Sequence, residues 1–145
     1  MLDNCWMNKV FLFAYTKCNL GDDLFIRAIL HRYPKVRFYL RGDQDQTLLD
    51  RFRDEKNLTI LSDESWFIRT AAKIRPSFAA RIKNHQEQRC NAVVYIGGSI
   101  FTEYPNWETI LTWWKYEAEH CRFFALGSNF GPWHTKEYRD SMATI

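Results

Sequence analysis

Three polar segments of this chain contain glycine, and each follows an apolar run. The segments are residues 19–23 (Asn-Leu-Gly-Asp-Asp), 97–99 (Gly-Gly-Ser) and 127–133 (Gly-Ser-Asn-Phe-Gly-Pro-Trp). Glycine has no Cβ and tolerates positive φ, so the backbone N–H groups of such segments can approach a ligand closely. The residue types therefore predict a site for a small polar or anionic molecule, assembled from three loops.

The first segment places an acidic pair, Asp22 and Asp23, at the start of a predicted helix. The first N–H groups of a helix have no partner within it and favour anions. Asp22 therefore either caps the helix or contacts a substrate, from which its carboxylate can accept a proton. Asn19 either forms a local turn or binds the ligand. We predict Asn19, Gly21 and Asp23 as binding residues and Asp22 as a catalytic residue.

The second segment, Gly97, Gly98 and Ser99, lacks the third glycine of a dinucleotide-binding fingerprint. A tight turn that packs the next helix against the sheet explains the two glycines equally well. Glu103 and Tyr104 follow in the same loop, where they either offer a carboxylate and a hydroxyl to a ligand or are solvated. We predict Gly97, Gly98 and Ser99 as binding residues and Glu103 as a second candidate proton acceptor.

The third segment combines two glycines with an asparagine and a proline, and proline fixes φ and stiffens a loop. Two interpretations stay open. In one, the segment is a stiff connection with Phe130 and Trp133 packed inward. In the other, Asn129, Gly131 and Pro132 contact the ligand.

The elements that must position these loops are predicted to alternate between strand and helix, because apolar runs alternate with amphipathic segments. The predicted strands are residues 9–15, 36–40, 58–61, 92–96 and 122–126, and the predicted helices are residues 22–32, 44–55, 66–74 and 78–88, a helix after Asn106, and residues 134–142. Asp63 and Asn106 are predicted caps, and Pro76 is predicted to end or kink the third helix. This order predicts an α/β fold, a Rossmann-like parallel sheet with helices on both faces, in one domain spanning residues 1–145.

Composition argues against several classes of protein. The hydrophobic fraction of 46% and the aromatic fraction of 17% argue against disorder. A net charge of +3, with basic residues such as those of 73–89 scattered along the chain, does not indicate a nucleic-acid partner. The four histidines lack metal-ligand spacing and a nucleophile partner, so we predict neither a metal site nor a hydrolase triad.

The cysteines and the apolar runs indicate a compartment. No apolar run is long enough to span a membrane, and no signal peptide is visible, so we expect no membrane insertion and a cytoplasmic location. Cysteines in that compartment are reduced thiols. The four cysteines, which show no paired spacing, are Cys5, Cys18, Cys90 and Cys121.

Taken in order, the three segments resemble the motifs of the polysaccharide pyruvyl transferase family. Those motifs are a strand into Asn-x-Gly-Asp-Asp, a strand into Gly-Gly and a strand into Gly-x-Asn-x-Gly-Pro, matched here by residues 19–23, 95–101 and 127–132. The resemblance implies the amino-terminal half of a glycosyltransferase-B fold, in which two Rossmann-like domains face each other across a cleft. It also implies transfer of pyruvate, as a ketal, from phosphoenolpyruvate to a sugar of a surface polysaccharide, with no cofactor.

The sequence departs from that family in two respects. Ser99 stands where many relatives carry a third glycine. Family members are also longer, and their second domain brings the basic and histidine residues expected to hold phosphoenolpyruvate, which nothing in this chain matches. A phosphate and a carboxylate require several cations or clustered N–H donors. We therefore expect the chain to line the acceptor side of a cleft and to lack transfer activity by itself.

Two other functions stay open. In the first, the chain is a non-catalytic remnant or a sugar-binding module. In the second, it is half of a sugar-nucleotide glycosyltransferase of similar two-domain build. The aromatic residues Tyr104, Phe130 and Trp133 are expected to be exposed and to favour a homo-oligomer.

Overall fold

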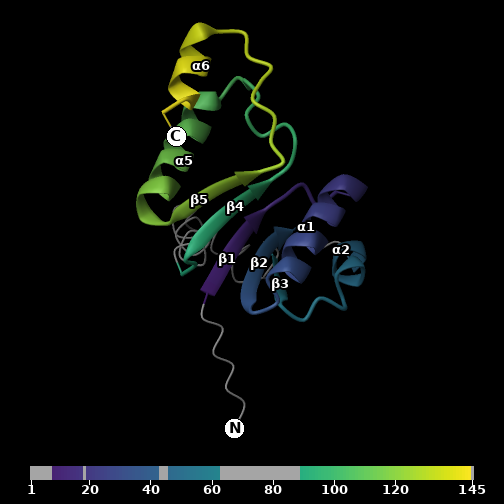
Figure 1. Ribbon diagram of the computed structural model, residues 1–145. Helices are drawn as coiled ribbons and strands as arrows, with labels where there is room; N and C mark the ends of the chain where they lie inside the picture. Colours follow the sequence, from purple (N-terminus) through teal and green to yellow (C-terminus); the bar gives the residue numbers. More distant parts are fainter. Residues whose placement is uncertain (1–7, 18, 43–45, 63–88, 145) are drawn as a thin grey trace, which may run out of the picture.

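Strands and helices alternate along the chain (Figure 1), of which the computed structural model describes residues 8–17, 19–42, 46–62 and 89–144. The elements are β1 (Asn8–Phe13), α1 (Leu20–Arg32), β2 (Val36–Gly42), α2 (Gln46–Arg51), β3 (Leu58–Ser62), β4 (Ala92–Ile96), α5 (Trp107–His120), β5 (Arg122–Leu126) and α6 (Lys136–Met142). All five predicted strands are confirmed, as are the four predicted helices that fall in these ranges. The helices predicted at 66–74 and 78–88, with Asp63 and Pro76, lie outside the described residues.

The five strands form one parallel sheet in the order β3-β2-β1-β4-β5. Successive strands run outward from β1 to β3 on one side, and the chain then returns to place β4 on the other side of β1. The carboxyl ends of β1 and β4 therefore flank the point where the strand order reverses, which is where open α/β sheets bind ligands. The predicted Rossmann-like α/β fold is confirmed.

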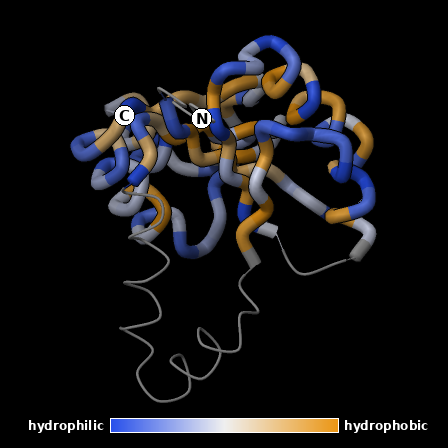
Figure 2. Tube along the Cα trace, turned by 90° about the horizontal axis from the view of Figure 1, so that it is seen from below, coloured by the Kyte–Doolittle hydropathy of each residue, from blue (hydrophilic) through white to orange (hydrophobic). Residues whose placement is uncertain are grey.

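Two apolar clusters cover the two faces of the sheet. Alternate strand residues point to opposite faces, so that Leu12 packs beneath α1 and α2 while its neighbour Phe11 packs beneath α5 and α6. Figure 1 shows these two helix pairs on opposite sides of the strands, and Figure 2 shows hydrophilic stretches mostly in the peripheral turns. Helices on both faces are thus confirmed. All five residues of β4 are buried, because the strand lies within the sheet and is covered on both sides.

Asn19 determines where α1 begins. Its side-chain oxygen accepts a hydrogen bond from the Gly21 N–H at 3.0 Å, which satisfies one of the helix's first donors. The helix therefore starts two residues before the predicted boundary, and Asp22 does not cap it. Asn106 occupies the predicted cap position of α5, but its side chain makes no capping hydrogen bond.

The expectations for the cysteines, the basic residues of 73–89 and membrane insertion concern residues of which the structure describes only some. Cys90 is buried and Cys121 is half-buried, whereas Cys5 and Cys18 lie outside the described ranges. Of the basic residues in 73–89, the structure describes only Arg89, which is exposed. Within these same ranges no helix has the length and apolar character needed to cross a bilayer.

Candidate functional site

A hollow of about 490 Å³ lies at the carboxyl edge of the sheet, between the ends of β1 and β4. Five of the residues predicted from the sequence line it, namely Asn19, Asp22, Gly97, Gly98 and Ser99. The first two come from the start of α1, and the other three come from the loop that follows β4. The reversal of strand order brings these two loops together, although they are far apart in the sequence.

Asp22 is the central acidic group of the hollow. Asp22 is only 8% exposed, and its Oδ2 accepts a hydrogen bond from Asn19 Nδ2 at 2.8 Å. Its Oδ1 faces the backbone of Gly97, where an added Cβ would lie 3.6 Å away. Burial, and then the charge of Asp23, raise the pKa of Asp22 above its usual value. A carboxylate with a raised pKa is a better proton acceptor than an ordinary aspartate.

Asn19 links the helix cap to this carboxylate. The side-chain oxygen accepts from Gly21 N–H, and the side-chain amide donates to Asp22. Because an amide has distinct donor and acceptor ends, these two bonds fix its orientation. Asn19 therefore forms the local turn and also orients the Asp22 carboxylate, and its direct contact with a ligand stays a prediction.

Asp23 points away from the hollow and forms an ion pair. Its Oδ2 lies 2.6 Å from Arg51 Nη1, and Arg51 Nη2 donates to the carbonyl of Thr16 at 2.6 Å. Arg51 is the last residue of α2, so this contact fastens the loop between β1 and α1 to a neighbouring helix. Asp23, predicted as a binding residue, thus has a clear structural contact, and a direct role in binding stays a prediction.

The third predicted segment lies beside the second. Asn129 N–H donates to the Gly98 carbonyl at 2.7 Å, and Gly131 N–H donates to the Phe101 carbonyl at 3.0 Å. An added Cβ at Gly98 would lie 3.8 Å from Asn129 Nδ2, so this amide sits at the edge of the hollow. The three glycine-containing segments therefore share one end of the molecule, as their positions after parallel strands predict.

Two further contacts complete this arrangement. Glu103 N–H donates to the Pro132 carbonyl at 3.3 Å, and the peptide bond before Pro132 is cis. An added Cβ at Gly127 would lie 2.8 Å from the ring of Phe25, which places the start of the third segment directly on α1.

Glu103 holds the start of α6. Its carboxylate accepts hydrogen bonds from the N–H groups of His134 and Thr135 and from the Thr135 hydroxyl. Desolvation acts to raise the pKa of Glu103, but the bonds from Thr135 and His134 outweigh it, and the pKa lies below the usual value. No local pattern predicts this contact, because the partners lie some thirty residues further along the chain.

Two tyrosines that sequence reasoning did not assign to the site, Tyr15 and Tyr95, also line the hollow. Tyr104, whose hydroxyl the sequence offered to a ligand, lines it as well. The Tyr95 hydroxyl donates to Glu117 Oε2 at 2.8 Å, and burial followed by the charge of Glu117 raises its pKa. The Tyr95 hydroxyl therefore takes part in a buried hydrogen bond with Glu117. Tyr15 follows β1 and Tyr95 is the last residue but one of β4, and this position at the carboxyl ends of adjacent strands is the signal that could have identified them.

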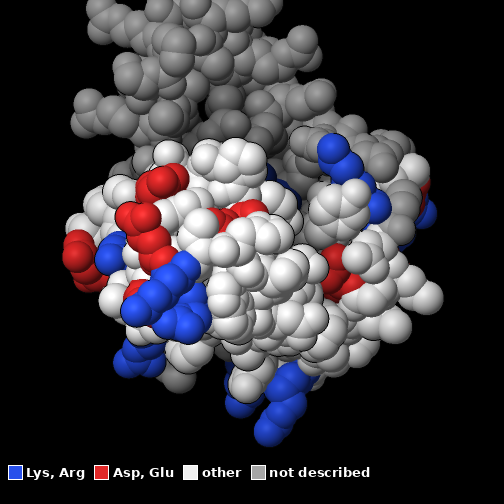
Figure 3. Space-filling view, turned by 90° about the horizontal axis from the view of Figure 1, so that it is seen from above, with Lys and Arg blue, Asp and Glu red and all other residues white. Residues whose placement is uncertain are grey.

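The charge around the hollow is low. No Lys or Arg is among the described residues that line it. Figure 3, which looks down on the molecule, shows acidic and basic side chains scattered over a mostly uncharged surface. Among the described parts of the chain, no group of three or more His, Cys, Asp or Glu residues could hold a metal ion. The hollow thus combines a carboxylate with hydrogen-bonding groups, and its described lining residues include no Lys or Arg.

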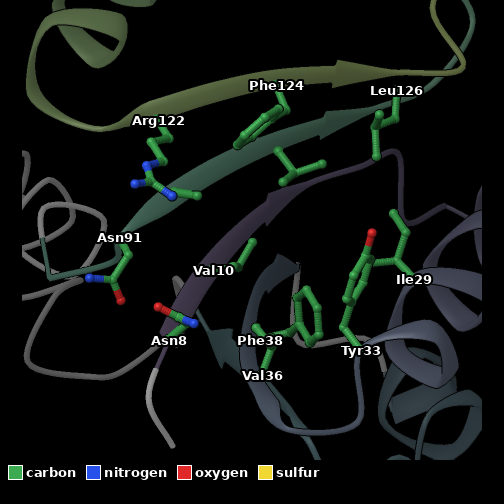
Figure 4. A pocket seen from close by; sticks show the side chains of 12 residues that line it. Asn8, Val10, Ile29, Tyr33, Val36, Phe38, Asn91, Arg122, Phe124 and Leu126 are labelled. Atoms are coloured by element: carbon green, nitrogen blue, oxygen red, sulfur yellow. The ribbon is translucent and has the colours of Figure 1, made fainter.

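A second hollow, of about 410 Å³, lies on the sheet face between α1 and β5 (Figure 4). It is mainly apolar, with Phe124 and Leu126 of β5 facing Ile29 of α1, and its polar residues Asn91 and Arg122 gather at the amino ends of the strands. No carboxylate lines it among the described residues, so it offers no proton acceptor.

Neither models of known protein families nor curated proteins give a match to this chain. The structure itself defines the class: a Rossmann-like α/β fold with a polar, carboxylate-containing hollow at the reversal point of a parallel sheet.

Proposed function

We propose that this chain is the acceptor-binding half of a polysaccharide pyruvyl transferase-like enzyme, which when complete transfers pyruvate from phosphoenolpyruvate to a sugar. The observation that supports this most is the position of Asp22, a buried carboxylate with a raised pKa, in a hollow that residues of the first two motifs line and that the third motif borders through Asn129 and Gly98. A phosphoenolpyruvate donor also favours a cytoplasmic location.

The proposed reaction requires a proton acceptor of this kind. Two hydroxyl oxygens of the sugar bond to C2 of the enolpyruvyl group, the bond from C2 to the phosphate oxygen breaks, and the methylene carbon gains a proton to become a methyl group. One hydroxyl proton is thereby transferred to carbon and the other leaves with the phosphate. Asp22 accepts a hydroxyl proton while Asn19 holds its carboxylate in place, and Ser99 with the backbone of Gly97 and Gly98 binds the neighbouring hydroxyls. Glu103 is the weaker candidate, because its carboxylate is held by α6 and its pKa is lowered.

The charge of the hollow favours the sugar over the donor. Phosphoenolpyruvate carries a phosphate and a carboxylate, and the described residues around the hollow supply no Lys or Arg to neutralise them. A neutral sugar requires only hydrogen-bonding groups. The same observation favours the second candidate, a sugar-binding module without catalysis, and the two differ in whether a donor-binding partner restores transfer.

Titration of the ¹⁵N-labelled chain tests the proposal. Methyl β-D-glucopyranoside should shift the backbone amides of Gly97, Gly98 and Ser99, whereas phosphoenolpyruvate alone should shift none of them. Asp22→Asn should weaken the glycoside effect. Asp50→Asn, which removes an exposed carboxylate on α2, should leave it unchanged.

Three results would contradict the proposal. The first is a phosphoenolpyruvate-dependent shift in the hollow, or release of phosphate from phosphoenolpyruvate by the chain alone. The second is a glycoside effect confined to the apolar hollow of Figure 4. The third is preferential binding of a sugar nucleotide at the three loops, which would indicate the glycosyltransferase alternative.

A further inference from the structure

Two exposed aromatic side chains stand next to the polar hollow, on the segment that follows β5. Phe130 and Trp133 are each more than two-fifths exposed, and their ring centroids are 5.3 Å apart. We propose that these two residues, here called the aromatic shelf, form a stacking subsite for a second pyranose ring of the acceptor. The inference rests on the proposed sugar binding and extends it from one ring to an oligosaccharide.

The aromatic shelf is held in place by the backbone beneath it. Gly131 has φ +107°, a conformation that side-chain-bearing residues rarely adopt, and an added Cβ there would lie 2.8 Å from the Trp133 ring. One part of the indole therefore rests directly on the glycine. Phe130 in turn contacts Phe101 at a centroid distance of 5.8 Å, and Phe101 contacts the buried Trp114 at 5.2 Å. The shelf is thus connected to the core, and binding does not have to order it.

The aromatic shelf is continuous with the polar hollow. Phe130 follows Asn129, whose N–H is bonded to the carbonyl of Gly98, and Gly98 lines the hollow. Phe130 also forms a parallel bridge with Phe101, two residues after Ser99. Tyr104, which lines the hollow and is almost half exposed, follows Glu103, whose N–H is bonded to Pro132. A sugar bound beside Asp22 therefore has the shelf within the same loop system.

The chemistry of this surface fits a saccharide. A pyranose ring has an apolar face of C–H groups and an edge of hydroxyls, so it binds where an aromatic ring and hydrogen-bonding groups occur together. The shelf offers the aromatic surface, and Asn129 and Ser99 offer an amide and a hydroxyl at its boundary with the hollow. A second copy of the chain is the competing occupant, because exposed aromatic residues also favour association.

A pair of titrations tests the inference. Cellobiose should shift the Trp133 indole N–H together with the hollow amides, whereas methyl β-D-glucopyranoside should shift mainly the hollow amides. Trp133→Ala should weaken cellobiose binding by about threefold to tenfold, the range expected for one aromatic contact, and should leave glucoside binding unchanged. Phe130→Ala should act in the same direction. Tyr33→Ala, which removes an exposed aromatic residue from the apolar hollow, should have no effect.

The results separate this inference from the proposed function. If neither cellobiose nor lactose shifts the Trp133 indole in the unmodified chain, or if both shelf variants bind cellobiose normally, the subsite is wrong. A Trp133 signal that depends on protein concentration and not on sugar identifies the shelf as a contact between copies, which also overturns it. Hollow amides that ignore every sugar while the Trp133 indole responds to cellobiose contradict the proposed function and leave the subsite standing.

Discussion

Replacing Arg51 with methionine should destabilise the chain by about 2 to 3 kcal/mol, mainly because the guanidinium loses its ion pair with Asp23 and its hydrogen bond to the Thr16 carbonyl. The side chains of Arg51 and Asp23 are only 23% and 14% exposed, and their atoms lie 2.6 Å apart. Unit charges about 4 Å apart interact by roughly 4 kcal/mol at the effective dielectric of such sites, a figure that solvent and the cost of desolvation reduce to about half. Loss of the bond to the Thr16 carbonyl adds about 1 kcal/mol.

The matched control is a second ion pair of similar length that is solvated. Arg53 lies 2.8 Å from Asp50, but the two side chains are 75% and 50% exposed. Arg53→Met should therefore cost less than about 0.5 kcal/mol. Arg51→Lys should give an intermediate loss, because one ammonium cannot reproduce the fork that reaches both Asp23 and Thr16.

Urea unfolding, followed by circular dichroism at pH 7, measures these free energies. The Asp23→Asn/Arg51→Met double variant should lose less than the sum of the single variants, since each single change leaves a partly buried group without its partner. If Arg51→Met costs no more than Arg53→Met, the ion pair does not hold the loop between β1 and α1, and the reasoning is refuted.

Three further changes have defined outcomes in the same unfolding assay. Asp22→Asn should stabilise the chain at pH 7, because the raised pKa of Asp22 means that its ionised form opposes folding. This gain in the free energy of unfolding should shrink as pH falls through the folded pKa and vanish below about 3.8. A lower free energy of unfolding at pH 7 contradicts the burial of this charge. Glu103→Gln should destabilise the chain at pH 7, and this loss should disappear as pH falls below 4.5 through the lowered folded pKa of Glu103. A loss of stability that does not depend on pH counts against the Glu103 carboxylate as the cap of α6. Gly131→Ala should cost about 1 to 2 kcal/mol through its positive φ and the Trp133 contact, whereas Gly98→Ala should cost less, and equal losses would contradict the strained backbone.

The sequence was sufficient for the order of elements, because the periodicity of apolar residues is a local property. It was less accurate at the ends. The first strand was predicted to reach residue 15 but ends at Phe13, and the following Ala14 and Tyr15 line the hollow. An apolar side chain at a strand end serves a ligand pocket as well as a core, so hydrophobicity alone does not separate the two.

The members of the candidate site were predictable in part, and their contacts were not. The rule that parallel strands share a carboxyl edge was enough to group Asp22 with Gly97 and Asn129. The same reasoning placed Asp22, as a catalytic residue, and Asp23, as a binding residue, in one site, whereas the structure turns Asp22 toward the hollow and Asp23 toward Arg51, 28 residues later in the chain. Glu103 shows the same difficulty, since its carboxylate is held by the start of α6. Pairings of this kind depend on tertiary packing, which leaves no local pattern.

The charge of Asp22 has a consequence for how the proposed reaction must be organised. A carboxylate with a raised pKa is useful as a proton acceptor only while it stays ionised, and an anionic donor placed beside it would raise its pKa further. The described lining supplies no Lys or Arg to offset that effect. On the proposed function, cations from another element must therefore approach the hollow together with phosphoenolpyruvate, both to bind the donor and to keep Asp22 ionised. Donor binding and activation of the acceptor hydroxyl are then coupled through the same positive charges, so the chain by itself should bind sugar and not react with phosphoenolpyruvate.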